Sequence, residues 1–272
     1  MTQPAEDHIR RLSILIRGAL HPPRGLGRIL LALFFGLLVH VIFVIGVISM
    51  IVAMFFGMSL SFGTVPEPYS NLANAALILQ FPLGHSLLLT TRGTRILTRL
   101  VPGQHGATLS TTTYAIIASI QLVLLFGFWT PSGIIWWQAT GGVFYTLVFA
   151  YASSWCLLVK ASFDAGAEVQ SGALGWMSLI QNVKPRFPGM PTGGLFKVIR
   201  QPIYVAFALT LWTVPVWTPD QLALALTLTS YCLIAPKLKE RRFLQRYGNR
   251  FRTYQRAVPY AVPCSVRRDK NA

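Results

Sequence analysis

Six long apolar runs take up most of this chain, and short polar segments separate them. The runs are residues 29–56, 72–89, 113–129, 134–159, 203–217 and 221–236. A stretch of about 17–25 apolar residues can cross the hydrocarbon core of a bilayer as a helix. Because 53% of the residues are hydrophobic and only 12% are charged, the sequence is typical of an all-α, polytopic integral membrane protein. We therefore expect about six membrane-embedded helices.

The basic residues are confined to alternate connections between these runs. The net charge is +16, yet segments 57–71, 130–133 and 218–220 contain no Lys or Arg. Because Lys and Arg accumulate on the cytoplasmic side of membrane proteins, these three segments are expected outside and both termini in the cytoplasm. The charge then reflects topology and attraction to anionic membrane lipid, and nucleic acid is not an expected partner.

The chain divides into a basic arm and one membrane domain. Residues 1–28 are polar and basic, and we expect a loosely ordered cytoplasmic arm or a short surface helix. The membrane domain, 29–272, would contain four spans within 29–159, a cytoplasmic loop at 160–199, and a hairpin with a surface helix at 200–260. The first run begins too late and is too long for a cleaved signal peptide, so it should be a retained span.

The last two apolar runs predict a helical hairpin, because the segment 218–220 between them contains a proline and favours a tight turn. Each helix would be about 22–24 Å long at 1.5 Å per residue. The hairpin would return Arg200 and Glu240 to the same depth, although 40 residues separate them. Pro236 is expected to break or kink the last span, before a basic surface helix that ends at Gly248.

Three ionisable residues are therefore expected near one depth of the membrane. His85 lies at the cytoplasmic end of the second run, at the level expected for Arg200 and Glu240. Ionisable groups in membrane segments usually face a bundle interior or a water-filled cavity. Two interpretations stay open for His85, which either lines a pocket or forms a hydrogen bond to a loop carbonyl. Two also stay open for Arg200 and Glu240, which either line a pocket or form a salt bridge that fixes the hairpin.

Several common catalytic motifs are absent from the sequence. The histidines form no HExxH or other close ligand pair, so no metal site is expected. No GxSxG elbow, Walker A loop or strand-linked GxGxxG is present, so a nucleotide-like cofactor would be held in another way. All 8 acidic residues lie outside the apolar runs, which argues against the carboxylate relay of a proton-driven transporter.

Short motifs follow one another around the hairpin in a recognisable order. Residues 200–204 read Arg-Gln-Pro-Ile-Tyr, Glu240 is followed by Arg, and 248–259 fit Gly-x-x-Phe-x-x-Tyr-x-x-x-Val-Pro. Residues 80–86, 163–164 and 192–195 add weaker matches upstream. This order resembles the isoprenylcysteine carboxyl methyltransferase superfamily, and within it most closely the bacterial methanethiol S-methyltransferases. The resemblance covers roughly 70–265.

The resemblance implies S-adenosylmethionine as the methyl donor and a small apolar thiol or other membrane-soluble substrate as the acceptor. Arg200, Glu240 and His85 would be the catalytic residues. The residues carried over to the donor site are Leu195, Arg200, Gln201, Pro202, Ile203, Tyr204 and Glu240. Two positions depart from the family pattern: Gln201 replaces a His, and Lys239 replaces the first Glu of a pair. Glutamine forms hydrogen bonds but carries no charge.

Three functions follow from these observations. The favoured one is an S-adenosylmethionine-dependent thiol methyltransferase in a bacterial inner membrane, with its site facing the cytoplasm and no obligate protein partner. The second is an isoprenylcysteine or lipid methyltransferase. The third is a non-catalytic membrane accessory protein that keeps the fold while Gln201 replaces the family histidine.

Overall fold

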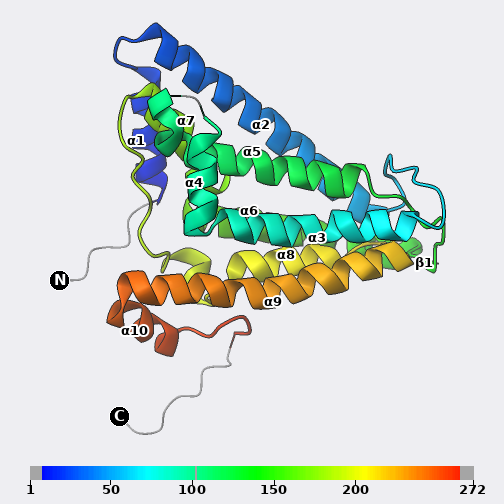
Figure 1. Ribbon diagram of the computed structural model, residues 1–272. Helices are drawn as coiled ribbons and strands as arrows, with labels where there is room; N and C mark the ends of the chain where they lie inside the picture. The colour runs from blue at the N-terminus through cyan, green and yellow to red at the C-terminus, as the bar shows by residue number, and fades with distance from the viewer. Residues whose placement is uncertain (1–7, 102, 264–272) are drawn as a thin grey trace, which may run out of the picture.

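The computed structural model describes residues 8–101 and 103–263 (Figure 1). The described part is mostly helical, so the all-α prediction is confirmed. Its helices are α1 (His8–Leu20), α2 (Leu26–Phe55), α3 (Ser70–Leu88), α4 (Thr91–Arg99), α5 (Gly106–Gly127), α6 (Gly141–Gln170), α7 (Ala173–Ile180), α8 (Pro202–Trp212), α9 (Pro219–Tyr247) and α10 (Asn249–Ala257). Two 3-10 turns, Gly103–His105 and Gly194–Lys197, and two short strands, β1 (Trp137–Gln138) and β2 (Val216–Trp217), complete it.

Each of the six apolar runs forms a helix, but the helices differ in length. Among the described residues, α2, α5, α6 and α9 are long and apolar enough to cross a membrane. Helices α3 and α4 make a fifth candidate only if they count as one span, because they meet at an angle of 92°. Helix α8 has 11 residues and is too short. The prediction of about six membrane-embedded helices is therefore confirmed for four.

The three segments without Lys or Arg gather at one end of the molecule. The peptide N–H of Phe62 donates to the carbonyl of Gly127 at 2.7 Å, which joins the connection after α2 to the end of α5. Trp136 donates to the carbonyl of Trp217 at 3.0 Å, next to the antiparallel pairing of β1 with β2. Asp220 accepts from the backbone N–H of Ser132 at 2.9 Å. These contacts place the three connections together, as expected if they lie on one side of a membrane.

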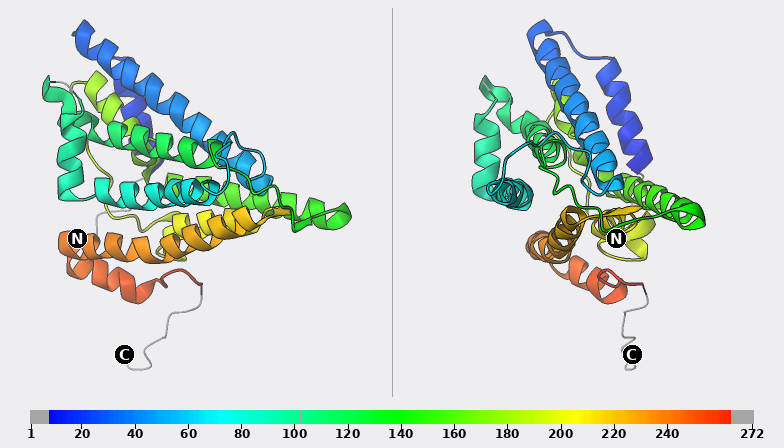
Figure 2. Two further views of the ribbon diagram at one scale, coloured as in Figure 1. Left: turned by 45° about the vertical axis from the view of Figure 1, so that its right-hand side comes forward. Right: turned by 90° about the vertical axis from the view of Figure 1, so that its right-hand side faces the viewer.

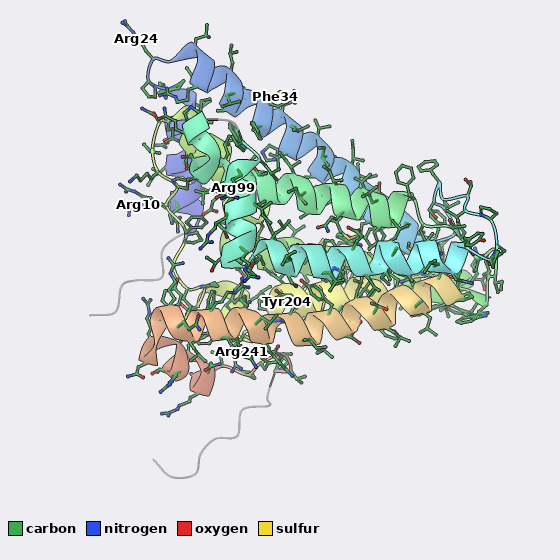
Figure 3. All side chains as sticks on the ribbon, viewed as in Figure 1. Arg10, Arg24, Phe34, Arg99, Tyr204 and Arg241 are labelled. Atoms are coloured by element: carbon green, nitrogen blue, oxygen red, sulfur yellow. The ribbon has the colours of Figure 1, made fainter. Side chains whose placement is uncertain are left out.

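The opposite end carries most of the basic side chains. Arg10, Arg24 and Arg99 lie there, around α1 and α4 (Figure 3). Within the segment 1–28, α1 is a surface helix that α7 contacts, and Gln181 after α7 donates to the carbonyl of Leu15 at 3.0 Å. The first and last described helices, α1 and α10, share this end (Figure 1), which agrees with both ends of the chain on one side.

The predicted cytoplasmic loop 160–199 is largely helical, so its length was overestimated. Helix α6 continues to Gln170, with a kink at Gly166, where φ is 101° and a residue with a side chain would be strained. Helix α7 follows and packs on α5. The buried Glu168 lies 3.6 Å from Arg11 of α1, which helps to hold this region against the rest of the protein.

The hairpin differs from its prediction in two respects. Helix α8 ends at Trp212, and the chain forms β2 before Thr218 accepts a hydrogen bond from the backbone of Gln221 and starts α9. Helix α9 then runs through Pro236 without a break, because a proline removes a single backbone hydrogen bond and the helix is buried on both sides of it. The predicted end at Gly248 is confirmed.

The apolar side chains form two groups, a buried core and exposed faces on the outer helices. The largest core cluster joins α2, α3, α5, α6, α8 and α9 near the β1 end. Helices α2 and α6 expose many large apolar side chains, for example Phe34 and Phe149, as expected where a helix meets lipid. Helix α10 lies on the outer side of the α8–α9 hairpin, away from α2 (Figure 2).

Candidate active site

Arg200 and Glu240 meet where α8 begins and the last third of α9 passes. The Nε of Arg200 donates to Oε1 of Glu240 at 2.8 Å, so the hairpin brings the pair together as predicted. Gln201 and Gln255 each donate from Nε2 to the same carboxylate, to Oε1 and Oε2 respectively, both at 2.8 Å. Glu240 is only 8% exposed, and its charge is therefore balanced by one guanidinium and two amides.

The remaining donors of Arg200 hold the C-terminal segment. Its Nη1 donates to the carbonyls of Gln255 at 2.8 Å and Val258 at 2.7 Å. Its backbone N–H donates to Pro259 at 2.9 Å. Arg200 thus ties α8, α9 and the chain after α10 together, which favours the interpretation of a salt bridge that fixes the hairpin.

A small hollow of about 10 Å³ lies beside this polar cluster, with room for about one water molecule. Gln201 lines it, and the Oε1 atom of Gln201 is buried without a hydrogen-bond partner among the described residues. Tyr254 lines it as well and donates to the carbonyl of Phe196 at 2.6 Å. Burial raises the pKa of the Tyr254 hydroxyl, so it stays protonated and keeps this bond.

Two larger hollows adjoin the cluster. The first, about 340 Å³, is lined by Ile203 and Tyr204 of α8 and by aromatic side chains such as Phe243; we call it the hairpin hollow. The second, about 490 Å³, is lined largely from α3 and α5, and we call it the α3–α5 hollow. Both volumes are within the range of small-molecule sites, about 300–1,000 Å³.

The two hollows share a wall. Its residues are Phe81, His85, Leu122, Gln170, Tyr204 and Lys239. Tyr204 of α8 (Figure 3) is central to it, because its ring also lies 5.2 Å from the Nζ of Lys239, as in a cation–π contact. A ligand in one hollow and a ligand in the other would therefore be separated only by side chains that both contact.

The structure places His85 at this wall, in the pocket-lining position. Its Nε2 lies 2.7 Å from the hydroxyl of Tyr114, and its buried Nδ1 has no hydrogen-bond partner among the described residues. His85 lines neither the small hollow nor the polar cluster of Arg200 and Glu240. The predicted set of catalytic residues therefore falls into two places, joined through Lys239.

Two further predicted donor contacts lie away from the hollows. Pro202 is the first residue of α8 and is buried there, where its fixed φ suits a helix start. The backbone N–H of Leu195 donates to Asp164 at 2.8 Å and so joins the 3-10 turn to α6. In this arrangement both residues shape the backbone near the site, and neither lines it.

Sequence reasoning missed the basic face of α9 that lines the hollows. Lys239 and Arg242 are three residues apart, so they lie on one face of the helix, while Glu240 turns towards Arg200. These residues were assigned to a surface helix after a break at Pro236. The sequence did not show that α9 continues without interruption past Pro236. Because it does, the helix face that packs in the bundle extends into the basic segment and brings Lys239 and Arg242 to the hollows.

Comparison with known proteins points to one enzyme class. A methanethiol S-methyltransferase of Pseudomonas deceptionensis is 29% identical over 74% of this chain and 76% of its own length. A methanethiol S-methyltransferase of Mycobacterium tuberculosis is 28% identical over 73% of this chain and 80% of its own length. Methanethiol S-methyltransferase 1 of Bradyrhizobium diazoefficiens is 27% identical over 70% and 66%.

No protein-family model matches the chain, and no solved structure matches it. The sequence relatives therefore carry the comparison. They confirm the predicted resemblance to methanethiol S-methyltransferases, and the class they support for this chain is a methyltransferase.

Proposed function

We propose that this relative of the methanethiol S-methyltransferases uses S-adenosylmethionine to methylate a small thiol such as methanethiol. The observation that carries the proposal is the shared wall between two hollows of ligand size. A donor in the hairpin hollow and an acceptor in the α3–α5 hollow would meet at His85, Tyr204 and Lys239. Holding two reactants next to each other removes much of the entropic cost of their encounter.

The residues of the hairpin hollow fit the donor. Ile203, Tyr204 and Phe243 offer an apolar and aromatic surface for an adenosyl group. The unpaired Oε1 of Gln201, in the adjoining small hollow, is an acceptor for the ammonium group or a hydroxyl. When bound, S-adenosylmethionine would supply an electrophilic methyl group. The acceptor sulfur would form a bond to this methyl carbon, and the electrons of the broken carbon–sulfur bond would stay on the donor sulfur.

His85 is proposed to take the proton of the acceptor thiol. Only the thiolate is a good nucleophile, so the thiol must be deprotonated at the wall between the hollows. The Nδ1 of His85 has no other partner among the described residues, and Tyr114 orients the ring through Nε2. The positive charge of Lys239 favours the thiolate at the same wall.

Arg200 and Glu240 are proposed to act by positioning. They tie the segment 255–259 to the hairpin, and this closes the side of the molecule on which the small hollow lies. A closed site keeps water from the reacting groups. The basic end of the molecule would face the cytoplasm of a bacterial inner membrane, where the soluble donor is available.

Donor binding and product formation test the proposal in sequence. Calorimetry on the full chain in nanodiscs of zwitterionic lipid should detect saturable binding of S-adenosylhomocysteine, the demethylated donor. Cells that express the chain and receive methanethiol should release dimethyl sulfide into the headspace. A matched strain with His85→Ala should release far less. Absence of donor binding would instead support the non-catalytic accessory protein.

A larger acceptor is the second candidate, and the volume of the α3–α5 hollow favours it. About 490 Å³ is much more than a thiol with one carbon atom fills. An isoprenylcysteine or a lipid would use the space more fully. Parallel assays with radiolabelled donor and methanethiol, farnesylcysteine or extracted lipid would rank the acceptors by the label each one receives.

A further inference from the structure

The α3–α5 hollow is lined by His85, by the two cationic residues Lys239 and Arg242, and by no acidic residue. Lys239 and Arg242, three residues apart on α9, both contribute to its wall. Its other polar residues include Thr94, Ser110 and Thr111, which carry hydroxyl groups and no charge. The wall therefore has a positive charge that none of its own lining residues balances.

Three carboxylates near this wall have other partners. Glu240 follows Lys239 in the sequence but points into the polar cluster, where a guanidinium and two amides contact it. Asp164 on α6 pairs with Lys160 and accepts the N–H of Leu195, and Glu168 lies 3.6 Å from Arg11. Glu240 still attracts Lys239 electrostatically, but none of the three carboxylates lines the hollow.

The polar groups of this wall have unused hydrogen-bonding capacity. The Nζ of Lys239 has no hydrogen bond or ion pair among the described residues, and it lies 5.2 and 6.0 Å from the ring centroids of Tyr204 and Phe243. The Oγ1 of Thr111 is buried and also lacks a partner there. The Nη1 of Arg242 donates to the carbonyl of Leu89 at 3.0 Å. A cation in apolar surroundings is costly unless an anion accompanies it.

Much of the remaining surface of the hollow is apolar. The large apolar side chains that provide it are Phe43, Phe81, Leu88, Leu97, Leu122 and Phe187. Most of them come from α2, α3, α4 and α5. A ligand that satisfies the whole hollow would therefore combine a negatively charged group with an apolar body.

We infer that the α3–α5 hollow binds a negatively charged acceptor, whose anionic group lies at Lys239 and Arg242 and whose apolar part extends towards α3 and α5. This inference rests on the proposed function, because it assigns the acceptor to this hollow. It specifies the substrate class as apolar thiols that also carry an acidic group. Neutral molecules of the same size would bind more weakly.

A pair of ligands with the same chain length tests this charge preference. Octanoate and octanol have similar apolar bodies and differ in charge, so calorimetry with the full chain in zwitterionic nanodiscs, corrected with empty nanodiscs, compares them directly. We expect octanoate to bind at least about tenfold more tightly, since a hydrogen bond to a charged group contributes about 1.5–3 kcal/mol. Lys239→Met and Arg242→Gln should each remove most of this preference, and Lys239→Arg should keep it.

Arg246→Gln is the matched control, because Arg246 is on the same helix and lines none of the hollows described here. It removes the same charge and should leave the preference unchanged. Equal binding of octanoate and octanol to the wild-type chain, or a preference that survives both cavity substitutions, would overturn the inference. So would displacement of octanoate by phosphatidylglycerol in the nanodisc, which would assign the two cations to a lipid headgroup.

The donor arm separates this inference from the proposed function. S-adenosylhomocysteine carries a carboxylate of its own, and Lys239 also lines the hairpin hollow. If Lys239→Met weakens S-adenosylhomocysteine and leaves the octanoate preference intact, Lys239 holds the donor and the inference is wrong. If the wild-type chain does not bind S-adenosylhomocysteine but still prefers octanoate, the proposed function fails and the anionic site stands.

Discussion

The polar cluster at Arg200 and the α3–α5 hollow differ in how far the protein itself satisfies their polar groups. Four donor atoms contact the carboxylate of Glu240, three of them at 2.8 Å, and the adjoining hollow has only about 10 Å³. In the α3–α5 hollow, Lys239 and Thr111 lack hydrogen-bond partners among the described residues, and about 490 Å³ lies beside them.

This difference suits the polar cluster to support of the fold and the α3–α5 hollow to ligand binding. The bonds within the polar cluster hold segments in place and leave Oε1 of Gln201 as a buried atom without a partner among the described residues. A hollow whose polar groups lack partners binds a complementary ligand more favourably, because the ligand supplies hydrogen bonds that the protein itself does not make. The motif residues of this chain are concentrated in the first region, and the residues that line the proposed acceptor site are in the second.

Removing Glu240 should have the largest effect and would test the supporting role. Glu240→Ala leaves the guanidinium of Arg200 and two amides without their acceptor, in a place where both ionic side chains are 11–13% exposed. We expect a loss of about 3 kcal/mol in the free energy of unfolding, at the lower end of the range for broken buried pairs. Thermal unfolding of the purified chain in detergent measures it.

Glu240→Gln is the control, because it keeps two polar atoms in the same place and should lose less stability. The supporting role of the polar cluster would be contradicted if Glu240→Ala unfolds at the wild-type temperature but no longer binds S-adenosylhomocysteine. Glu240 would then contact the donor directly, as a member of the site and not of its support.

Substitution of His85 should come next and should affect turnover more than donor binding. His85→Ala removes the proposed base, and general bases contribute at least about a hundredfold to a rate. Headspace dimethyl sulfide should fall by about that factor, whereas the affinity for S-adenosylhomocysteine should change far less, although His85 also lines the hairpin hollow. A rate within threefold of the wild type would show that the thiol loses its proton elsewhere. His85→Gln keeps a hydrogen bond to Tyr114 and separates the base from the positioning of that residue.

The order of motifs in the sequence was enough to predict the meeting of Arg200 with Glu240, since a hairpin of any moderate length produces it. The sequence was also enough to place the segments without Lys or Arg at one end, because charge patterning reflects which side each connection is on. Both predictions depend on the order of elements along the chain and are insensitive to where each element ends.

The predictions that failed depend on element boundaries. An apolar run records burial or lipid contact and not helix length, so residues 213–217 were assigned to α8 although part of them pairs with β1. Pro236 was expected to break or kink α9, but the helix continues without a break to Tyr247, with Cys232, Ala235 and Glu240 buried around the proline. That single error hid Lys239 and Arg242, which the unbroken helix places on one face at the wall of the α3–α5 hollow.

Tyr204 should give the third largest effect, because it belongs to the wall that the two hollows share. Tyr204→Ala removes an aromatic surface from the proposed donor site and the ring beside Lys239. We expect S-adenosylhomocysteine affinity to fall by about tenfold, in line with the loss of an aromatic and a cation–π contact. Calorimetry checks this, with Tyr204→Phe as the control that keeps the ring and should stay near the wild-type value.

Gln201→His should produce the smallest change. It tests whether the polar cluster tolerates the residue found at this position in the family that the chain resembles. Histidine can still donate one hydrogen bond to Glu240, so the support of the hairpin should be kept. A charged imidazole there would add one more cation beside a carboxylate that Arg200 already balances. We expect donor affinity and thiol methylation to change by less than about fivefold, or about 1 kcal/mol.

A rise of a hundredfold or more on Gln201→His, measured in the same headspace assay, would contradict this expectation. It would mean that the cluster does chemistry in the resembling enzymes and that Gln201 has weakened it here. An unchanged rate would instead agree with a cluster whose contribution is to hold α8, α9 and the segment after α10 together, while selection of the acceptor is made across the wall at Lys239.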